Sequence, residues 1–257
     1  MTGSAPVPLQ LILAVGLGVL GAIIGSFIAA LVMRWPEGRS VMGGRSACDA
    51  CDRTLTAIDL IPLLSALLLR GRCRTCGAKI DPLHGWIEAG GAGIGIAAGL
   101  VAPGYPALAG AVFGWLLLVL VALDLVAFWL PDRLTALLAL SGAVSAMAGV
   151  APGGVDRLIG GVAGFTALWA VARGYRLVRG REGMGGGDPK LFGGIGLWLG
   201  WQMLPAVLLI ASMIGLGVVL SAQLRGRPMT AQTALPFGAL LGIAAYPAWL
   251  FMIAGAA

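Results

Sequence analysis

Residues 183–190 read Gly-Met-Gly-Gly-Gly-Asp-Pro-Lys, and the thirty residues that follow, Leu191–Leu220, carry no charged side chain. Further apolar runs recur along the 257-residue chain, which is 59% hydrophobic and only 11% charged. Soluble domains average about 25% charged residues, and a helix crosses a bilayer with roughly 17–25 mostly apolar residues. The sequence therefore predicts an all-α membrane protein built as a polytopic helical bundle.

Asp188 is the acid of this opening stretch and the first candidate for a functional role. An acid at the edge of an apolar segment costs free energy and marks a functional site by default. Glycines at 185–187 allow a substrate or a neighbouring helix to approach the backbone closely. We expect Asp188 to act with a second acid. Asp124 is the candidate, because it lies about two helical turns before the boundary marked by Pro131 and Asp132.

The apolar runs divide into about eight membrane-spanning helices. Their approximate ranges are 9–33, 83–101, 107–123, a stretch that ends near 150, 158–171, two short helices within 191–220 that turn near 202–205, and 234–254. The run 191–220 is assigned two helices by parity, since basic loops precede and follow it. We expect three parts: a first helix (1–33), a polar loop (34–82) and a transmembrane core (83–257).

Positive charge gathers in a few loops. The chain has 17 Lys and Arg against 11 Asp and Glu, and every cation except Arg157 falls in loops assigned to one side. The positive-inside rule makes that side cytoplasmic. The amino terminus is then outside, and Asp124 and Asp188 lie toward the cytoplasm. This distribution indicates orientation and contact with anionic membrane lipid rather than binding to nucleic acid. The first ten residues lack Lys and Arg, so we expect a retained helix and not a cleavable signal peptide.

All four cysteines lie in the polar loop, as Cys48-Asp-Ala-Cys51 and Cys73-Arg-Thr-Cys76. Two CxxC pairs separated by 21 residues fall close to the spacing of a Cys₄ zinc site. Two disulfides are the alternative, but disulfides rarely persist in a reducing cytoplasm. We predict a cytoplasmic, zinc-ribbon-like loop with Cys48, Cys51, Cys73 and Cys76 as ligands of a structural zinc ion.

Two acids at one membrane depth have three possible uses. They can activate a water molecule by sharing a proton, as in aspartic proteases. They can couple cation binding to transport, or each can form a structural hydrogen bond between helices. A histidine-dependent nucleophile is poorly supported, because the only histidine, His84, lies at a membrane edge. Phosphate-binding and dinucleotide motifs are missing as well.

Several motifs, taken in order, resemble those of the bacterial prepilin peptidases, or type IV leader peptidases. They are Gly25-Ser-Phe27, Arg34-Trp-Pro36, Gly44-Arg-Ser46, Asp59-Leu-Ile-Pro62, the two CxxC pairs, Asp124 with Leu130-Pro-Asp132, Gly183–Leu191, Leu199-Gly-Trp201 and Pro236-Phe-Gly238. One departure is Ala239, since the family usually has proline after that glycine. The resemblance covers most of the chain.

The resemblance implies a GxGD-type aspartic endopeptidase of the bacterial inner membrane. Such enzymes remove the basic leader from prepilins and pseudopilins of type IV pili and type II secretion systems. They cleave after a glycine on the cytoplasmic side. Many also methylate the new amino terminus with S-adenosylmethionine, for which the sequence identifies no pocket. By position, the catalytic pair is Asp124 and Asp188, and Asp132 is a recurrent acid outside that pair. An ion-coupled transporter and an inert assembly factor are the alternatives, and the sequence specifies no oligomeric state.

Overall fold

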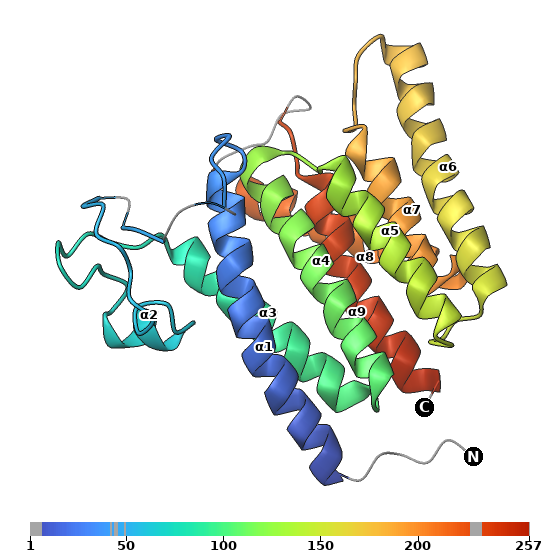
Figure 1. Cartoon of the computed structure of the whole chain (residues 1–257). Coiled ribbons are helices and arrows are strands. Elements are labelled where there is room, and N and C mark those ends of the chain that lie inside the picture. The colour runs from blue at the N-terminus through green and yellow to red at the C-terminus, as the bar shows by residue number, and fades with distance from the viewer. Residues whose placement is uncertain (1–6, 42, 44–45, 49, 227–232, 257) are drawn as a thin grey trace. The chain divides into compact units, whose positions relative to one another are not determined.

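The computed structural model describes residues 7–41, 43, 46–48, 50–226 and 233–256. Their regular structure is helical, apart from two isolated β-bridges (Figure 1). Five of these helices are long and apolar enough to cross a membrane: Leu9–Arg34, Tyr105–Ala127, Gly154–Arg179, Trp201–Leu224 and Phe237–Gly255. The expected helical membrane fold is confirmed, while eight crossings remain a prediction. Gly44, Arg45 and Asp49, which belong to motifs quoted in the sequence analysis, lie outside the described residues.

The chain forms two compact units, one ending at Val119 and the other beginning at Leu120, inside one helix. The first unit contains α1 (Val7–Arg34), the short α2 (Leu64–Leu68), α3 (Pro82–Val101) and most of α4 (Tyr105–Ala127). The second unit contains the end of α4 and then α5 (Asp132–Met147), α6 (Gly154–Arg179), α7 (Gly187–Leu199), the 3₁₀ turn η1 (Trp201–Met203), α8 (Leu204–Leu224) and α9 (Phe237–Ala256).

In the first unit, α1 and α3 pack side by side through glycines (Figure 1). A Cβ on Gly21 would overlap the carbonyl group of Gly91, and a Cβ on Gly91 would overlap that of Gly21. Small residues at such spacings let helix backbones approach closely where lipid removes the hydrophobic drive to associate. Gly18 and Gly25 also lie against α3, whereas Gly16 has open space beside it.

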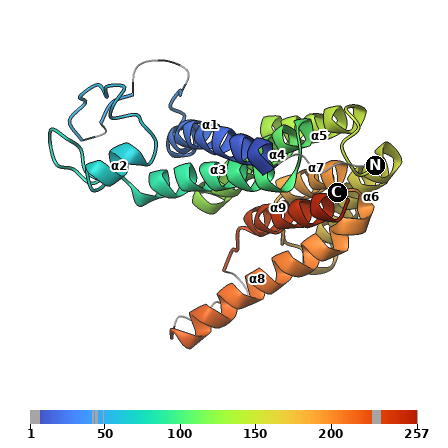
Figure 2. The same ribbon diagram turned by 90° about the horizontal axis from the view of Figure 1, so that it is seen from below.

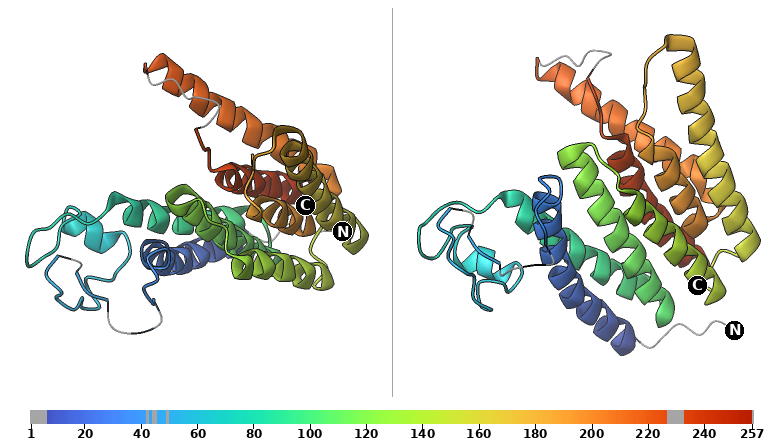
Figure 3. Two further views of the ribbon diagram at one scale, coloured as in Figure 1. Left: turned by 90° about the horizontal axis from the view of Figure 1, so that it is seen from above. Right: turned by 45° about the horizontal axis from the view of Figure 1, so that its top comes forward.

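The polar loop forms a separate lobe beside the N-terminal end of α3 (Figure 3). Each CxxC pair sits in a small hairpin, closed by the bridges Ala47–Thr54 and Arg72–Lys79. The only helix among the described residues of this loop is the five-residue α2. The loop therefore lacks a helical core of its own.

In the second unit, α6 packs on α7 and α7 packs on α5, while α9 contacts both α7 and α8. Close approach of α6 and α7 again depends on glycine, since a Cβ on Gly196 would overlap the carbonyl group of Gly160. Figure 2 shows α8 running at an angle to α9, with its C-terminal end projecting beyond it. This packing leaves α7 in the middle of the unit, with ten of its thirteen residues buried.

The run 191–220 does contain a break at the predicted place. Gly200, with a φ of +71°, ends α7, and α8 begins at Leu204. The sequence analysis expected two short helices, but only α7 is short, at 13 residues, while α8 has 21. The difference arises because α8 continues through polar Ser221 and Gln223 to Leu224, beyond the apolar run.

Arg157, the one cation outside the loops assigned to the cytoplasmic side, is buried inside the second unit, and all three of its guanidinium nitrogens donate hydrogen bonds. It is 1% exposed and donates six hydrogen bonds of 2.8–3.0 Å. The acceptors are the carbonyl groups of Gly142, Val150, Ala151, Pro152 and Leu197 and the hydroxyl group of Ser145. The guanidinium group also lies 5.8 Å from the centroid of the Trp198 ring. Arg157 thus ties α5, α6 and α7 together at one point.

Candidate active site

Asp124 lies in the last turn of α4 with its side chain buried, and the residue is 5% exposed. Its Oδ2 accepts a hydrogen bond of 2.7 Å from the backbone N–H of Ala239, at the start of α9. The sequence analysis placed Asp124 about two turns before the boundary marked by Pro131 and Asp132, just after a helix expected over about 107–123. The helix continues to Ala127 and ends there, where Phe128 has a positive φ of +50°. Asp124 therefore lies inside the last turn of the helix.

Asp188 lies in the first turn of α7 and is 6% exposed. Its N–H donates to the carbonyl oxygen of Gly185 over 3.2 Å, which folds the glycine stretch into a tight turn. Gly187 leaves room for Leu130, whose Cβ would lie 2.7 Å from a side chain added at that glycine. The glycines therefore make space around Asp188 for the segment that follows Asp124.

A third element, the start of α9, brings the two acids together. A Cβ built on Gly238 would lie 3.0 Å from Asp188 Oδ1 and 3.1 Å from Asp124 Oδ2. These distances are two sides of a triangle, so the two oxygens are no more than about 6.1 Å apart. A single water molecule can hydrogen-bond both oxygens over such a span, at roughly 2.6–3.2 Å from each. The arrangement is capable of general acid–base chemistry on that water molecule.

The four cysteines converge in the polar loop. Their sulfur atoms all lie within 4.8 Å of one another, and Cys48 Sγ is 3.9 Å from Cys76 Sγ. A tetrahedral zinc ion with Zn–S bonds of about 2.3 Å holds its sulfurs about 3.8 Å apart. All four cysteines are free, and a disulfide requires about 2.05 Å between sulfurs. The N–H groups of Cys76 and Thr75 donate to Cys73 and lower its pKa to about 6, which favours the thiolate that a metal binds. The donor set fits a zinc ion.

Asp59 braces the two hairpins against each other. Its Oδ2 accepts hydrogen bonds from Thr56 and from Arg53 Nη2, and its Oδ1 lies 3.4 Å from Arg74 Nε. The N–H and hydroxyl group of Thr56, with Arg53, lower the pKa of Asp59 to about 2. Arg53 follows the first CxxC pair and Arg74 lies inside the second. One carboxylate therefore joins the two halves of the cysteine cluster.

Glu88 attaches the polar loop to α3. It is 4% exposed, and its Oε2 accepts a hydrogen bond of 2.7 Å from the N–H of Leu63, which has a strained φ of +61°. Its Oε1 lies 3.5 Å from Nε2 of His84, one turn earlier on α3. Glu88 therefore holds the backbone of the polar loop at Leu63 against α3.

Comparison with known proteins places these features in a family. Residues 19–101 match the Bacterial Peptidase A24 N-terminal domain, and residues 111–220 match the Type IV leader peptidase family. A protein of Aeromonas hydrophila is 39% identical over 217 residues, which cover 82% of this chain and 73% of the relative. It is named prepilin leader peptidase/N-methyltransferase. The chain belongs to the type IV leader peptidase family.

Two further relatives of the same name give the same result. A protein of the same name from Burkholderia pseudomallei (strain K96243) is 37% identical over 262 residues, covering 92% of this chain and 84% of its own. One from Klebsiella pneumoniae is 38% identical over 199 residues, covering 75% and 87%. No solved structure matches the chain significantly. The resemblance seen in the motifs is thus confirmed.

In this leader peptidase, the structure separates Asp132 from the acidic pair. Asp132 is exposed, and its Oδ1 accepts a hydrogen bond of 2.7 Å from Lys190 Nζ. Lys190 is therefore neither a partner of Asp188 nor a freely solvated residue. The side chains of this ion pair are 75% and 45% exposed, and such a pair contributes about 0–1 kcal/mol. Its effect is to join α5 to the start of α7.

Sequence reasoning found Gly238 only as part of a motif and gave it no role. Its position against both carboxylates depends on α9 returning to α4, with a separation of 115 residues between Asp124 and Ala239, and to α7, and no local pattern reports such a contact. Ala239 departs from the usual family proline, and this departure has a visible result. It supplies the N–H that Asp124 accepts, which a proline lacks.

Proposed function

We propose that this protein is a membrane aspartic endopeptidase that removes the basic leader from type IV prepilins and pseudopilins. The observation that carries the proposal is the buried pair Asp124 and Asp188, held within reach of one water molecule against Gly238. The relatives' name, prepilin leader peptidase/N-methyltransferase, supports this reaction. The family match favours it over the ion-coupled transporter that two acids alone leave open.

Proteolysis by this pair follows from sharing one proton between two nearby carboxyl groups. The ionised carboxylate removes a proton from the bound water as its oxygen attacks the carbonyl carbon of the scissile peptide bond. The protonated carboxyl group gives its proton to the carbonyl oxygen. The tetrahedral intermediate then breaks its C–N bond, and the first carboxyl group gives its proton to the leaving nitrogen. As the C=O bond re-forms, a hydroxyl group of the intermediate returns a proton to the second carboxylate. One water molecule is consumed, and both carboxyl groups recover their starting states.

The burial of both acids supports this reading, because an unpaired charge in a buried apolar setting is costly and is retained where it serves a function. Access for the substrate is provided by Gly185, which has no side chain beside Asp188 Oδ2; a Cβ there would lie 3.4 Å from that oxygen. An extended backbone on either side of the scissile bond needs such space. We propose that the glycines shape this approach.

Zinc is the proposed metal of the polar loop, held by Cys48, Cys51, Cys73 and Cys76. The sulfur spacing supports four thiolate ligands around one tetrahedral ion. When bound, zinc supplies folding free energy to a segment without a core of its own. The chain's own residues complete the lobe through Asp59 and Glu88. We assign the metal no part in the hydrolysis.

N-methylation of the new amino terminus is the second proposed activity, supported by the relatives' name. S-adenosylmethionine is then the methyl donor. A cavity lies next to the segment that carries Asp188, and its charged lining residues are Arg173, Arg176, Lys190 and Glu182. This excess of positive charge does not fit S-adenosylmethionine well, because the donor itself carries net positive charge. We therefore derive no methylation step from the described residues.

The proposed placement is the bacterial inner membrane, with eight crossings, the amino terminus outside and the acidic pair facing the cytoplasm. Five helices of sufficient length and apolarity support a membrane position. The cationic end of α6, with Arg173, Arg176 and Arg179, supports the side assignment through the positive-inside rule. We also propose the division into a first helix (1–33), a polar loop (34–82) and a transmembrane core (83–257).

The test uses the purified full chain, a prepilin-like substrate and S-adenosylmethionine, read by mass spectrometry. Asp124→Asn and Asp188→Asn should each reduce leader removal by more than about 10²-fold, since each removes one proton-transfer group. Asp132→Asn is the matched control and should cleave normally. Normal processing by either pair variant would exclude the assignment. The transporter would be favoured if wild type carried a cation flux in proteoliposomes but cleaved no peptide, and if the same variants lost that flux.

A further inference from the structure

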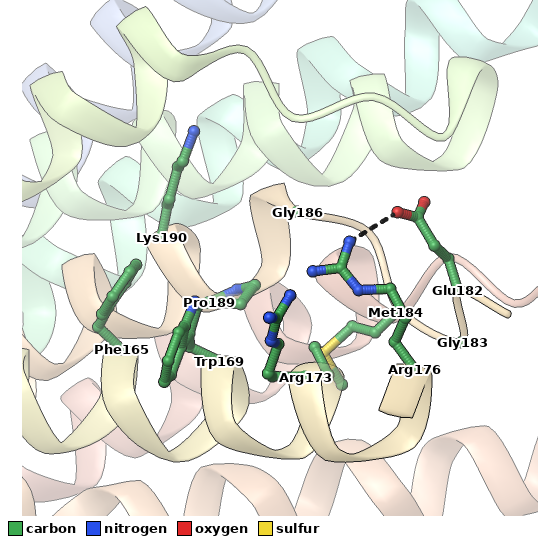
Figure 4. A pocket seen from close by; sticks show the side chains of 11 residues that line it. Phe165, Trp169, Arg173, Arg176, Glu182, Gly183, Met184, Gly186, Pro189 and Lys190 are labelled. Atoms are coloured by element: carbon green, nitrogen blue, oxygen red, sulfur yellow. Dashed lines mark hydrogen bonds and ion pairs between the residues drawn. The ribbon is translucent and has the colours of Figure 1, made fainter. Parts of the chain in front are cut away.

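An open-sided cavity lies next to the segment that carries Asp188, within the second unit. Its volume is about 360 Å³, in the range of about 300–1,000 Å³ typical of ligand sites. Figure 4 shows Phe165, Trp169 and Arg173 following one another along α6, with Met184 and Pro189 on the chain segment opposite. Neither Asp124 nor Asp188 belongs to its described lining. The cavity is thus separate from the acidic pair.

The charges around the cavity favour an anionic ligand. Its lining includes Arg173, Arg176 and Lys190 against the single acid Glu182. Lys190 forms an ion pair with Asp132. Arg176 forms an exposed ion pair with Glu182, with 3.3 Å between Nη1 and Oε1. Arg173 forms no ion pair with any residue that the structure describes. The cavity therefore offers one unpaired guanidinium group and a second one held only by a solvent-exposed contact.

An exposed apolar stripe on α6 leads to these cations. Leu158, Val162, Phe165 and Trp169 follow one another at intervals of four, three and four residues, which places them on one helical face. Their exposed fractions are 65%, 65%, 39% and 53%. Since α6 is long and apolar enough to span a membrane, this exposed face meets lipid chains. Trp169 lies one turn before Arg173, in the order of tryptophan and cation typical of a membrane boundary.

We infer that the cavity binds the headgroup phosphate of an anionic glycerophospholipid, with an acyl chain lying along the stripe from Trp169 to Leu158. Arginine is suited to phosphate because its planar fork donates two parallel hydrogen bonds. Basic pockets beside membrane helices are known to take lipid headgroups. A basic prepilin leader is repelled by these cations. A free phosphate ion has the matching charge but makes no use of the apolar stripe.

The binding test titrates the purified full chain, in neutral detergent, with phosphatidylglycerol or phosphatidylcholine and counts bound lipid by native mass spectrometry. We expect wild type to retain phosphatidylglycerol in preference to phosphatidylcholine. Arg173→Gln and Arg176→Gln should each weaken that binding about fivefold, and the corresponding lysine variants should keep most of it. Arg179→Gln, one turn further on α6 and outside the cavity lining, is the matched control and should bind as wild type.

Lipid carrying bromine on its acyl chain then locates the site, because bromine quenches nearby tryptophan fluorescence. Brominated phosphatidylglycerol should quench wild type more than brominated phosphatidylcholine does, and Trp169→Phe should remove this excess. An excess that survives Trp169→Phe would place the lipid elsewhere. Equal binding of the two lipids, or an equal effect of Arg179→Gln, would also overturn the inference. Displacement by millimolar inorganic phosphate would assign the site to free phosphate instead. None of these readouts depends on peptide cleavage, so failure here is distinguishable from failure of the proposed peptidase.

Discussion

Gly238→Ala adds one methyl group at the point where α4, α7 and α9 meet. The new Cβ would lie 3.0 Å from Asp188 Oδ1, 3.1 Å from Asp124 Oδ2 and 2.7 Å from Leu130 Cδ1. The leucine methyl group is the end of a flexible side chain and can move aside. The two carboxylates are fixed by their helix positions and by the bond from Ala239. The methyl group thus competes directly with any water molecule shared by the two acids.

The size of the effect follows from that geometry. A general acid or base must lie about 2.6–3.2 Å from its proton partner, and losing such a group costs about 10²–10⁴-fold in rate. We expect Gly238→Ala to cleave the leader about 10²–10⁴-fold more slowly than wild type. The free energy of unfolding should fall by about 0–2 kcal/mol, because overpacking costs about 1–3 kcal/mol while alanine improves helix propensity by about 1 kcal/mol over glycine.

The assay compares wild type, Gly238→Ala and Gly217→Ala in leader removal and in thermal unfolding followed by circular dichroism. Gly217 is the matched control, because it is also a helical glycine of the second unit and has nothing within 4 Å of an added Cβ. It should cleave as wild type. If Gly238→Ala unfolds normally and cleaves within about threefold of wild type, the proposed meeting of the two acids at Gly238 is wrong.

Two further predictions concern the supports of the fold. Arg157→Met should destabilise the protein by about 3–5 kcal/mol, because it leaves buried carbonyl groups without donors. Thermal unfolding measures this loss. Arg157→Lys, with at most three donors, should have a stability between those of wild type and Arg157→Met. An Arg157→Met protein as stable as wild type would contradict the role drawn from its six hydrogen bonds. Protein purified without chelator should contain about one zinc ion per chain, and Cys73→Ser should lose most of it by elemental analysis. Metal-free wild type with two disulfides would refute the Cys₄ assignment.

The long helices of this protein were predictable because a helix that crosses a bilayer needs about 20 consecutive, mostly apolar residues, and such runs are visible in the sequence. The break between α7 and α8 was found by counting basic loops, and it falls at Gly200, where a left-handed residue ends the helix. The helix expected over about 107–123 runs one turn further, to Ala127. It ends before the boundary marked by Pro131, at the positive φ of Phe128, which no residue preference reports. Local signals thus locate helices better than they locate helix ends.

The acids of the site were predictable for a reason that does not extend to their neighbours. A carboxylate in an apolar run is conspicuous because burying charge is costly, so Asp124 and Asp188 could be selected from the sequence. Gly238 and Arg157 act through contacts made across the second unit. One glycine among 42 is inconspicuous, and Arg157 looked like an exception to the orientation rule.

Arg157 shows how such an exception can be resolved. A buried arginine is tolerated only where its donors are satisfied, and here the acceptors are backbone carbonyl groups near helix ends and in the turn between α5 and α6. Those carbonyl groups need donors as much as the guanidinium group needs acceptors. The cation therefore belongs to the packing of α5, α6 and α7, and it carries no information on membrane orientation. Without Arg157, every remaining Lys and Arg falls in the loops that the sequence analysis assigned to one side, and the cytoplasmic placement of Asp188 that follows from them stays a prediction.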